Sequence, residues 1–246
     1  MDTKPPTARA LAREAVHASI LAAARARLTQ EGPSQLALRA VARDVGMVSS
    51  AVYRYFASRD DLLTALLVLD YDELGAAVET ADAALDRADV GGRWRAACHA
   101  IRDWAIAHPG DFALLYGSPV PGYVAPRSTI EPASRTTHVL VQVVVDAWAA
   151  GRHGARPAPA AAPADLTPAI GDAAAYLRER GFADDLPDEL VLRTLMAWTT
   201  VFGVVSFELF GHAVGSVSDA TAYFDHVVAR LADDLGISGR RTTGVG

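Results

Sequence analysis

The chain has 246 residues, of which 51% are hydrophobic and 21% are charged, so it can bury a sizeable core and is not disordered by composition. Its formal net charge of −6 excludes a nucleic-acid binder that is basic throughout. Cys98 is its only cysteine, which excludes an intrachain disulfide and a multi-cysteine metal site. The charge is uneven, however. The first 61 residues carry nine basic and six acidic side chains, a balance of +3, and the rest carries 14 and 23, a balance of −9. The chain therefore joins a basic N-terminal part to an acidic body.

Helical periodicity runs along most of the chain, because apolar residues recur at intervals of three and four. Ser58 is suited to cap a long helix, whose first turn carries Asp60 and Asp61 where the helix dipole favours negative charge. No segment shows the two-residue alternation of a half-buried strand, so the predicted fold class is all-α. The other predicted helices cover 8–31, 38–45, 49–56, 92–108, 111–116, 130–150, 168–180, 187–210 and 219–235.

Segments without helical patterning are predicted to be flexible. They are a tail at 1–8, a linker rich in proline and alanine at about 152–168, and a second tail at 237–246. The first eight residues lack an apolar stretch, so no signal peptide is expected. The longest apolar run, 194–207, is too short to cross a bilayer and predicts a buried helix. A cytoplasmic protein without a membrane partner is expected.

A helix-turn-helix pattern lies within residues 36–63. Two short helices are joined by a turn that contains Gly46, and the second helix is free to enter a major groove. Its first residues are small and can approach base edges closely, and tyrosine hydroxyls and guanidinium groups further on suit phosphate oxygens. The positions concerned are Ser49, Ser50, Ala51, Tyr53, Arg54, Tyr55 and Arg59. By spacing alone, a small helical hairpin with an ordinary solvated basic face stays an open alternative.

The order of residues in this segment resembles the signature of the tetracycline-repressor (TetR) family. The similarity covers about residues 12–65 and rests on Leu36, Leu38-Arg39, Val41-Ala42, Gly46, Val52-Tyr53-Arg54-Tyr55-Phe56, Arg59 and Leu62-Leu63. Two positions depart from the family pattern, since Ala37 and Val48 stand where a serine or threonine usually caps each short helix. Each lost cap is expected to cost about 1 kcal/mol.

The resemblance implies an all-helical homodimer with an N-terminal three-helix DNA-binding domain, here 9–61, and a C-terminal ligand-binding and dimerisation domain, here 62–236. Carried over by position, Arg39 is implied to read a base in the major groove. Ser49, Ser50 and Ala51 are implied to lie on the recognition helix, and Tyr53, Tyr55 and Arg59 to contact the DNA backbone or support such contacts. A salt bridge from Arg39 to Asp44 or to another local carboxylate is the structural alternative for that arginine.

The acidic body carries no comparable signature, so its sites are expected only from residue type and position. A ligand pocket is expected between the middle helices, although plain core packing is the alternative for each aromatic side chain. His138 and Gln142 are included because buried polar groups need partners, which a ligand can supply. The candidate lining residues are Tyr71, Trp104, Tyr116, His138, Gln142, Trp148, Trp198 and Phe202.

The last two long helices are expected to form the dimer interface. In the final helix, an apolar stripe recurs at heptad-like spacing, and the helix before it is apolar around much of its circumference. The stripe consists of Phe224, Val228, Leu231 and Leu235.

Other chemistry finds little support in the sequence. Asp70, Asp72 and Glu73 lie close together, and we interpret them as a solvated face. A metal site from His99, His108 and Asp111 is a remote alternative. No catalytic residues, metal or cofactor are therefore predicted, and the chain is not expected to be an enzyme.

The predicted function is a ligand-responsive DNA-binding transcriptional regulator, a repressor that a small molecule releases from a palindromic double-stranded DNA operator. The alternative is a helical enzyme or small-molecule-binding protein whose N-terminal motif does not bind DNA.

Overall fold

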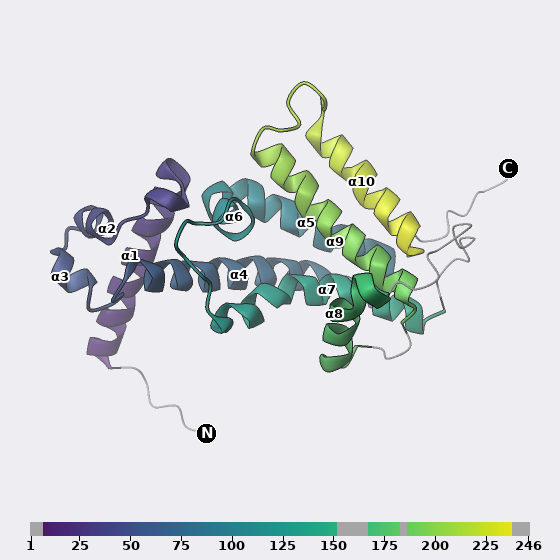
Figure 1. The fold of residues 1–246 in the computed structure, drawn as a ribbon, viewed down its shortest axis with the longest axis horizontal. Coiled ribbons are helices and arrows are strands. Elements are labelled where there is room, and N and C mark those ends of the chain that lie inside the picture. Colours follow the sequence, from purple (N-terminus) through teal and green to yellow (C-terminus); the bar gives the residue numbers. More distant parts are fainter. Residues whose placement is uncertain (1–6, 152–166, 183–185, 238–246) are drawn as a thin grey trace. The chain divides into compact units, whose positions relative to one another are not determined.

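The computed structural model describes residues 7–151, 167–182 and 186–237. The predicted tails at 1–8 and 237–246 and the predicted linker at 152–168 lie outside these ranges, apart from their edges. All regular elements in the described ranges are helices, in agreement with the predicted all-α class (Figure 1). The predicted helix ends agree with the structure to within two residues, except for the helix predicted at 49–56, which is shorter.

The chain forms two compact units. Unit 1 comprises residues 1–73 and 105–133, and unit 2 comprises residues 74–104 and 134–246. Unit 1 therefore contains more of the chain than the predicted DNA-binding domain, which ends at residue 61. The reason is that the sixth helix packs on the first, which brings the segment after residue 105 into unit 1.

Unit 1 is built around one apolar core shared by its helices. The buried side chains include Ile20, Leu28, Val41, Val52 and Leu63. They come from helices whose apolar residues recur at helical spacing, so each helix turns one stripe to the others. Its elements are α1 (Ala8–Glu31), η1 (Pro33–Gln35), α2 (Leu38–Asp44), α3 (Ser49–Val52), the first part of α4 (Arg59–Ala83), the end of α5 (Val90–Ala107), α6 (Pro109–Tyr116) and η2 (Arg127–Thr129), and it ends within the first turn of α7.

A charged cluster is buried where α1, α4 and α6 meet, and it overturns the interpretation of Asp70 as part of a solvated face. Asp70 is 0% exposed and lies 2.9 Å from the guanidinium of Arg25, which also holds Glu73 and, at 2.9 Å, Asp111. Close packing explains the burial. At Gly110, the first turn of α6 lies so close to α1 that a Cβ atom there would stand 2.6 Å from the backbone nitrogen of Thr29.

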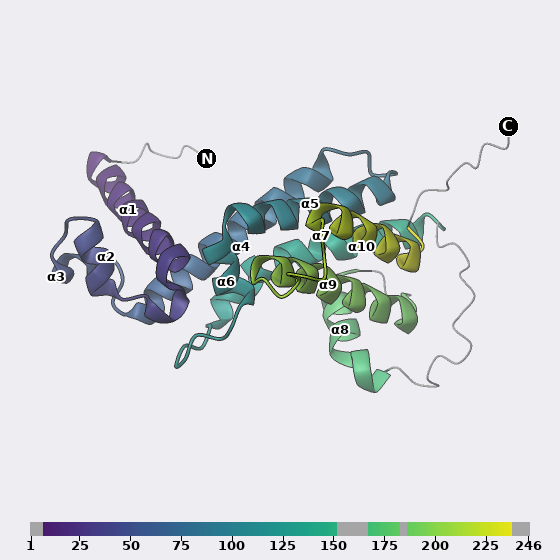
Figure 2. The same ribbon diagram turned by 90° about the horizontal axis from the view of Figure 1, so that it is seen from above.

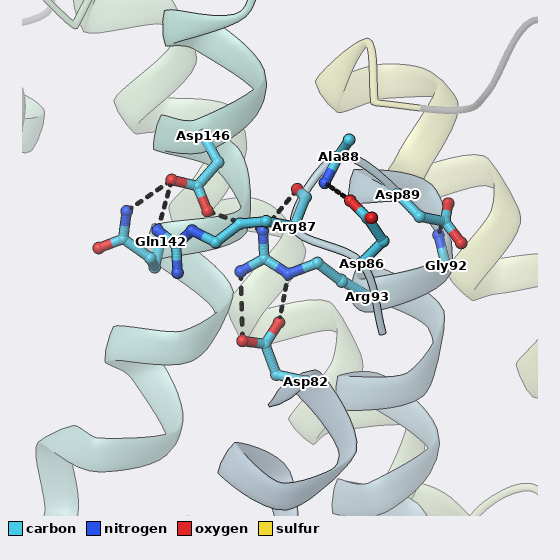
Figure 3. Close-up of polar contacts among 9 residues, drawn as sticks. All are labelled: Asp82, Asp86, Arg87, Ala88, Asp89, Gly92, Arg93, Gln142 and Asp146. Carbon is cyan, nitrogen blue, oxygen red and sulfur yellow. Dashed lines mark hydrogen bonds and ion pairs between the residues drawn. The ribbon is translucent and has the colours of Figure 1, made fainter. Parts of the chain in front are cut away.

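Unit 2 contains the remaining helices, and α10 packs along α9 (Figures 1 and 2). Three of its helices are joined by Arg93, which is buried and donates to both Asp82 of α4 and Asp146 of α7 (Figure 3). Pairing satisfies a charge that would otherwise be costly to bury. Beyond parts of α4 and α5, its elements are α7 (Ile130–Ala149), α8 (Thr167–Glu179), α9 (Asp188–Leu209) and α10 (Ala220–Leu235).

The apolar run at 194–207 lies inside α9, which is only partly buried. Val201 and Val205 belong to the core, whereas Met196 is 54% and Phe207 58% exposed. By length and composition, the 22 residues of α9 could cross a membrane, which corrects the expectation drawn from the shorter run. A single such helix is weak support for a membrane span, and α9 carries an ion pair from Glu208 to Arg102 of α5.

Candidate functional site

The turn between α2 and α3 has the geometry that the helix-turn-helix pattern predicts. Gly46 adopts a left-handed conformation with φ of +66°, which a side chain would disfavour. Its N–H donates to the carbonyl of Arg43, and the N–H of Met47 donates to that of Ala42. These two bonds form a Schellman motif, which ends α2 and sets the direction in which α3 leaves.

The presence or absence of a side-chain cap at the start of α2, α3 and α4 agrees with the prediction from sequence. Neither Ala37 nor Val48 supplies a side-chain cap to α2 or α3, whereas the hydroxyl of Ser58 accepts from the N–H of Asp61 at 3.0 Å. The predicted recognition helix is wrong in length, since α3 ends at Val52 and the next residues form a turn. An uncapped helix of four residues has few internal hydrogen bonds, so tertiary packing of its buried side chains holds it in place.

The side chains implied to read DNA lie on or next to this hairpin. Arg39, Ser50 and Tyr53 are exposed, and the other implied positions are partly exposed: Ser49, Ala51, Tyr55 and Arg59. The alternative salt bridge from Arg39 to Asp44 is not present in the structure, where Asp44 accepts from Arg27 of α1 at 2.5 and 2.9 Å. Among the described residues, Arg39 has no hydrogen bond or ion pair. Its guanidinium group therefore stands at the start of α2, open to a partner.

Arg59 is bound within the motif, which fits the supporting role that the resemblance implied as one of two possibilities. Its Nε donates to the carbonyl of Leu36 at 2.8 Å, and its Nη2 donates to the carbonyls of Pro33 and Ser34, each at 3.1 Å. The side chain thus ties the start of α4 to the segment that precedes α2. Of the two implied roles, we therefore favour that of a positioning residue for the motif over a direct phosphate contact.

Unit 2 contains a cavity of about 260 Å³ between α7, α8 and α9. It borders a small apolar cluster made by the same helices, which includes Val141, Ile170, Leu177 and Val191. Among the residues that the structure describes, those that line the cavity carry no formal charge: Ser134, Thr137, Leu140, Val141, Ala173, Tyr176, Leu177, Val191, Thr194, Leu195 and Trp198.

Of the eight predicted ligand residues, Trp198 alone lines this cavity. His138 is one step removed, because its Nε2 lies 2.7 Å from the hydroxyl of Tyr176, which does line it. The amide of Gln142 donates to Asp146 instead (Figure 3). Both polar groups therefore have partners within the protein and do not need a ligand to supply one.

The other predicted ligand residues do not form one site. Tyr71 and Tyr116 belong to unit 1, where their rings meet edge to face with centroids 6.2 Å apart. Phe202 is buried beside Trp198, and Trp104 and Trp148 belong to unit 2 without lining the cavity. Burial raises the pKa of the Tyr71 and Tyr116 hydroxyls, as expected for aromatic side chains in a core.

The predicted dimer stripe is wrong for most of its residues, because the protomer buries them itself. Phe224 is 0% exposed, and Val228 and Leu235 are buried too, so these three cannot face a second chain. Leu231 is partly exposed. Trp94 of α5 donates to the carbonyl of Val228, which shows that this face of α10 packs inside unit 2. The exposed apolar side chains nearby are Met196, Phe207, Phe210, Val214 and Tyr223.

The remote metal alternative also lacks support in the described residues. They contain no group of three or more histidine, cysteine, aspartate or glutamate side chains placed to hold a metal ion. His99 pairs with Asp225 at 3.0 Å in unit 2, whereas Asp111 belongs to the Arg25 cluster in unit 1.

Sequence reasoning missed the Arg25 cluster and the contribution of α8 to the cavity. Each depends on residues far apart in the chain: Arg25 lies 86 positions from Asp111, and His138 lies 38 from Tyr176. Helical spacing in α8 places Ala173, Tyr176 and Leu177 on one face, but spacing alone does not show what that face covers.

Comparison with known proteins identifies the family of both parts of the chain. Residues 20–66 match the family described as bacterial regulatory proteins, tetR family, and residues 94–231 match the tetracyclin repressor-like C-terminal domain. The HTH-type transcriptional regulator Rv1816 of Mycobacterium tuberculosis (strain ATCC 25618 / H37Rv) is 41% identical over 224 residues, which cover 87% of this chain and 89% of that protein. The HTH-type transcriptional regulator Mb1846 of Mycobacterium bovis matches with the same identity and coverage.

Solved structures agree with this assignment. The regulatory protein SCO4313 superposes with a TM-score of 0.70 at 31% identity, over 93% of this chain and 100% of that one. The TetR family transcriptional regulator PfmR from Thermus thermophilus shares the fold, with a TM-score of 0.53 at 17% identity over 85% and 97% of the two chains. Together with the helix-turn-helix geometry, these matches show that the chain is a DNA-binding transcriptional regulator of the TetR family.

Proposed function

We propose that the protein is a dimeric repressor that a small molecule releases from a palindromic operator. The observation that carries the DNA-binding part is Arg39, an exposed guanidinium group at the start of α2 with no partner among the described side chains and carbonyls. A guanidinium fork matches the O6 and N7 acceptors of guanine. Ser49, Ser50 and Ala51 are the proposed recognition positions on α3, and Tyr53 and Tyr55 are proposed to contact or support the phosphate backbone.

The proposed dimer uses the exposed faces of α9 and α10. Met196, Phe207, Phe210, Val214 and Tyr223 are large apolar side chains that water would otherwise surround. A two-fold dimer would present two copies of α3, and such dimers bind half-sites about one DNA turn apart, roughly 34–36 Å. The operator is therefore expected to be palindromic.

The proposed effector site is the cavity between α7, α8 and α9. Helix α4 contributes residues to both units, so a ligand that favours one arrangement of unit 2 can act on the DNA-binding unit through one continuous helix. Coupling between two sites is typically about 1–3 kcal/mol, which corresponds to a change of about 5- to 150-fold in DNA affinity.

Binding titrations test the DNA-binding part. The DNA upstream of the protein's own gene and a scrambled duplex of equal length are titrated at several salt concentrations with the wild type, Arg39→Ala and Arg95→Ala. Arg95 is exposed on α5 in unit 2 and serves as a matched loss of one positive charge. Arg39→Ala is expected to weaken operator binding by about 1–3 kcal/mol and to leave the scrambled duplex much less affected.

Equal weakening of both duplexes by Arg39→Ala would contradict its role in base reading and would leave Ser49 and Ser50 as the main candidates. An affinity for the upstream DNA that does not fall with salt in the wild type would contradict operator binding altogether.

A further inference from the structure

The residues that line the cavity between α7, α8 and α9 indicate which ligands it can bind. Its described lining residues include no acidic, basic or imidazole side chain, and eight of the eleven are leucine, valine, alanine, tyrosine or tryptophan. A charged ligand group placed there would leave water without gaining an opposite charge, which is strongly unfavourable. An ionic group of either sign is therefore disfavoured against these walls.

The few hydroxyl groups in the lining are partly used by the protein itself. Thr194 donates to the carbonyl of Leu190 at 2.7 Å, and the hydroxyl of Tyr176 is bonded to His138. An oxygen that already donates its proton can still accept a hydrogen bond. A ligand with one hydroxyl group could thus be accommodated, whereas a strongly polar ligand would lose more hydrogen bonds to water than it gains.

The aromatic walls are held in place before any ligand enters. Tyr176 is fixed by His138 on its hydroxyl and by the guanidinium of Arg180, which lies 5.2 Å from its ring centroid. On α9, the ring of Trp198 packs against Phe202 with centroids 6.1 Å apart. A preformed wall binds a ligand at a smaller entropic cost than a wall that must first be ordered.

The volume sets the size of the part of a ligand that the cavity can enclose. At the packing density of protein interiors, about 260 Å³ holds a molecule with on the order of ten non-hydrogen atoms. We propose that this cavity binds an uncharged, mainly apolar molecule of about that size, with one hydroxyl group at most as its polar part. This inference rests on the proposed function in placing the effector here, and it adds the chemical class of that effector.

Calorimetric titration with three probes of equal chain length tests the charge selectivity. The probes are 1-nonanol, nonanoate and nonylamine at pH 7, which carry no charge, a negative charge and a positive charge. On the full chain, 1-nonanol is expected to bind at least tenfold more tightly than either ion. Equal affinities for all three probes, or binding of none of them, would overturn the proposal.

Two substitutions on α8 test the location. Ala173→Leu adds three carbon atoms to a residue in the lining, and Ala169→Leu adds the same atoms to an exposed position on the same helix. The first is expected to weaken 1-nonanol binding at least tenfold, and the second to leave it unchanged. Equal effects of the two would overturn the location.

A substitution that introduces a charge tests the location independently, in case Ala173→Leu disturbs the fold. Thr137→Lys places an ammonium group at the edge of the cavity from a partly exposed position on α7. It is expected to reverse the preference so that nonanoate binds more tightly than 1-nonanol. An unchanged preference would contradict the proposal.

Operator titrations with and without 1-nonanol separate this inference from the proposed function. Binding that Ala173→Leu weakens, together with an unchanged operator affinity, would support the cavity and contradict gating by its ligand. Operator release that Ala173→Leu leaves intact would contradict the cavity as the effector site while supporting ligand gating.

Discussion

Replacing Asp70 by asparagine tests the buried charge cluster of unit 1. One guanidinium, that of Arg25, faces the carboxyl groups of Asp70, Glu73 and Asp111, and His108 adds a further interaction with Asp111. Burial, reinforced by the neighbouring Asp111, raises the pKa of Asp70 from 3.8 to about 8 even though Arg25 opposes the shift. The carboxyl group is therefore protonated at neutral pH, and asparagine is a neutral substitute of nearly the same shape.

The sign of the effect follows from the raised pKa. Stability that depends on protonated Asp70 is fully present below its unfolded pKa of 3.8 and is lost as the pH rises through about 8. Each pH unit in this window costs about 1.4 kcal/mol, so at pH 7 the folded state pays up to about 4 kcal/mol to keep the proton. Asp70→Asn removes this cost, and we expect it to stabilise the protein by about 2–4 kcal/mol at pH 7.

Urea unfolding followed by circular dichroism at pH 5, 6, 7 and 8, at one protein concentration, measures this effect. The gain from Asp70→Asn should grow with pH across the series. Asp172→Asn, the same change at an exposed position on α8, is the control and should change stability by less than about 0.5 kcal/mol. A loss of stability in Asp70→Asn at pH 7 would refute the reasoning, because it would mean that the ionised carboxylate and its attraction to Arg25 dominate.

Three further predictions concern the motif and the dimer. Gly46→Ala should cost about 1–2 kcal/mol in thermal unfolding, because alanine disfavours a left-handed φ although its Cβ meets no neighbour; an unchanged melting temperature would contradict this. Arg59→Ala should lose about 2 kcal/mol of stability and leave the salt dependence of DNA binding unchanged. Arg54→Ala, at an exposed position, should reduce the slope of log affinity against log salt at unchanged stability. A slope that falls by about one per subunit in Arg59→Ala would show that Arg59 contacts a phosphate after all. Phe207→Asp should raise the dimer dissociation constant at least tenfold in sedimentation, and Val124→Asp, at an exposed loop position, should not; equal behaviour of the two would remove α9 from the interface.

Local signals in the sequence predicted the features that depend on neighbours along the chain. The helix-turn-helix turn depends on Gly46 and on hydrogen bonds between residues close together in the chain, and the cap of α4 depends on Ser58 and a residue three positions later. Helix ends follow from proline, glycine and capping residues, and helices from apolar spacing. These forces act over one or two turns, so a sequence pattern contains most of what they depend on, although it overestimated the length of α3.

Tertiary packing decided what lies on each helix face. Asp70 has the sequence surroundings of a solvated carboxylate, yet α1 and α6 cover it and bring Arg25 to it. The stripe of Phe224 and Val228 has the spacing of an interface, yet α5 covers it within the same chain. Arg59 has the charge of a phosphate contact, but the folded backbone places three carbonyls within its reach. Periodicity shows that a face is apolar or charged, whereas its partner depends on segments tens of residues away, and only the three-dimensional packing of those segments determines it.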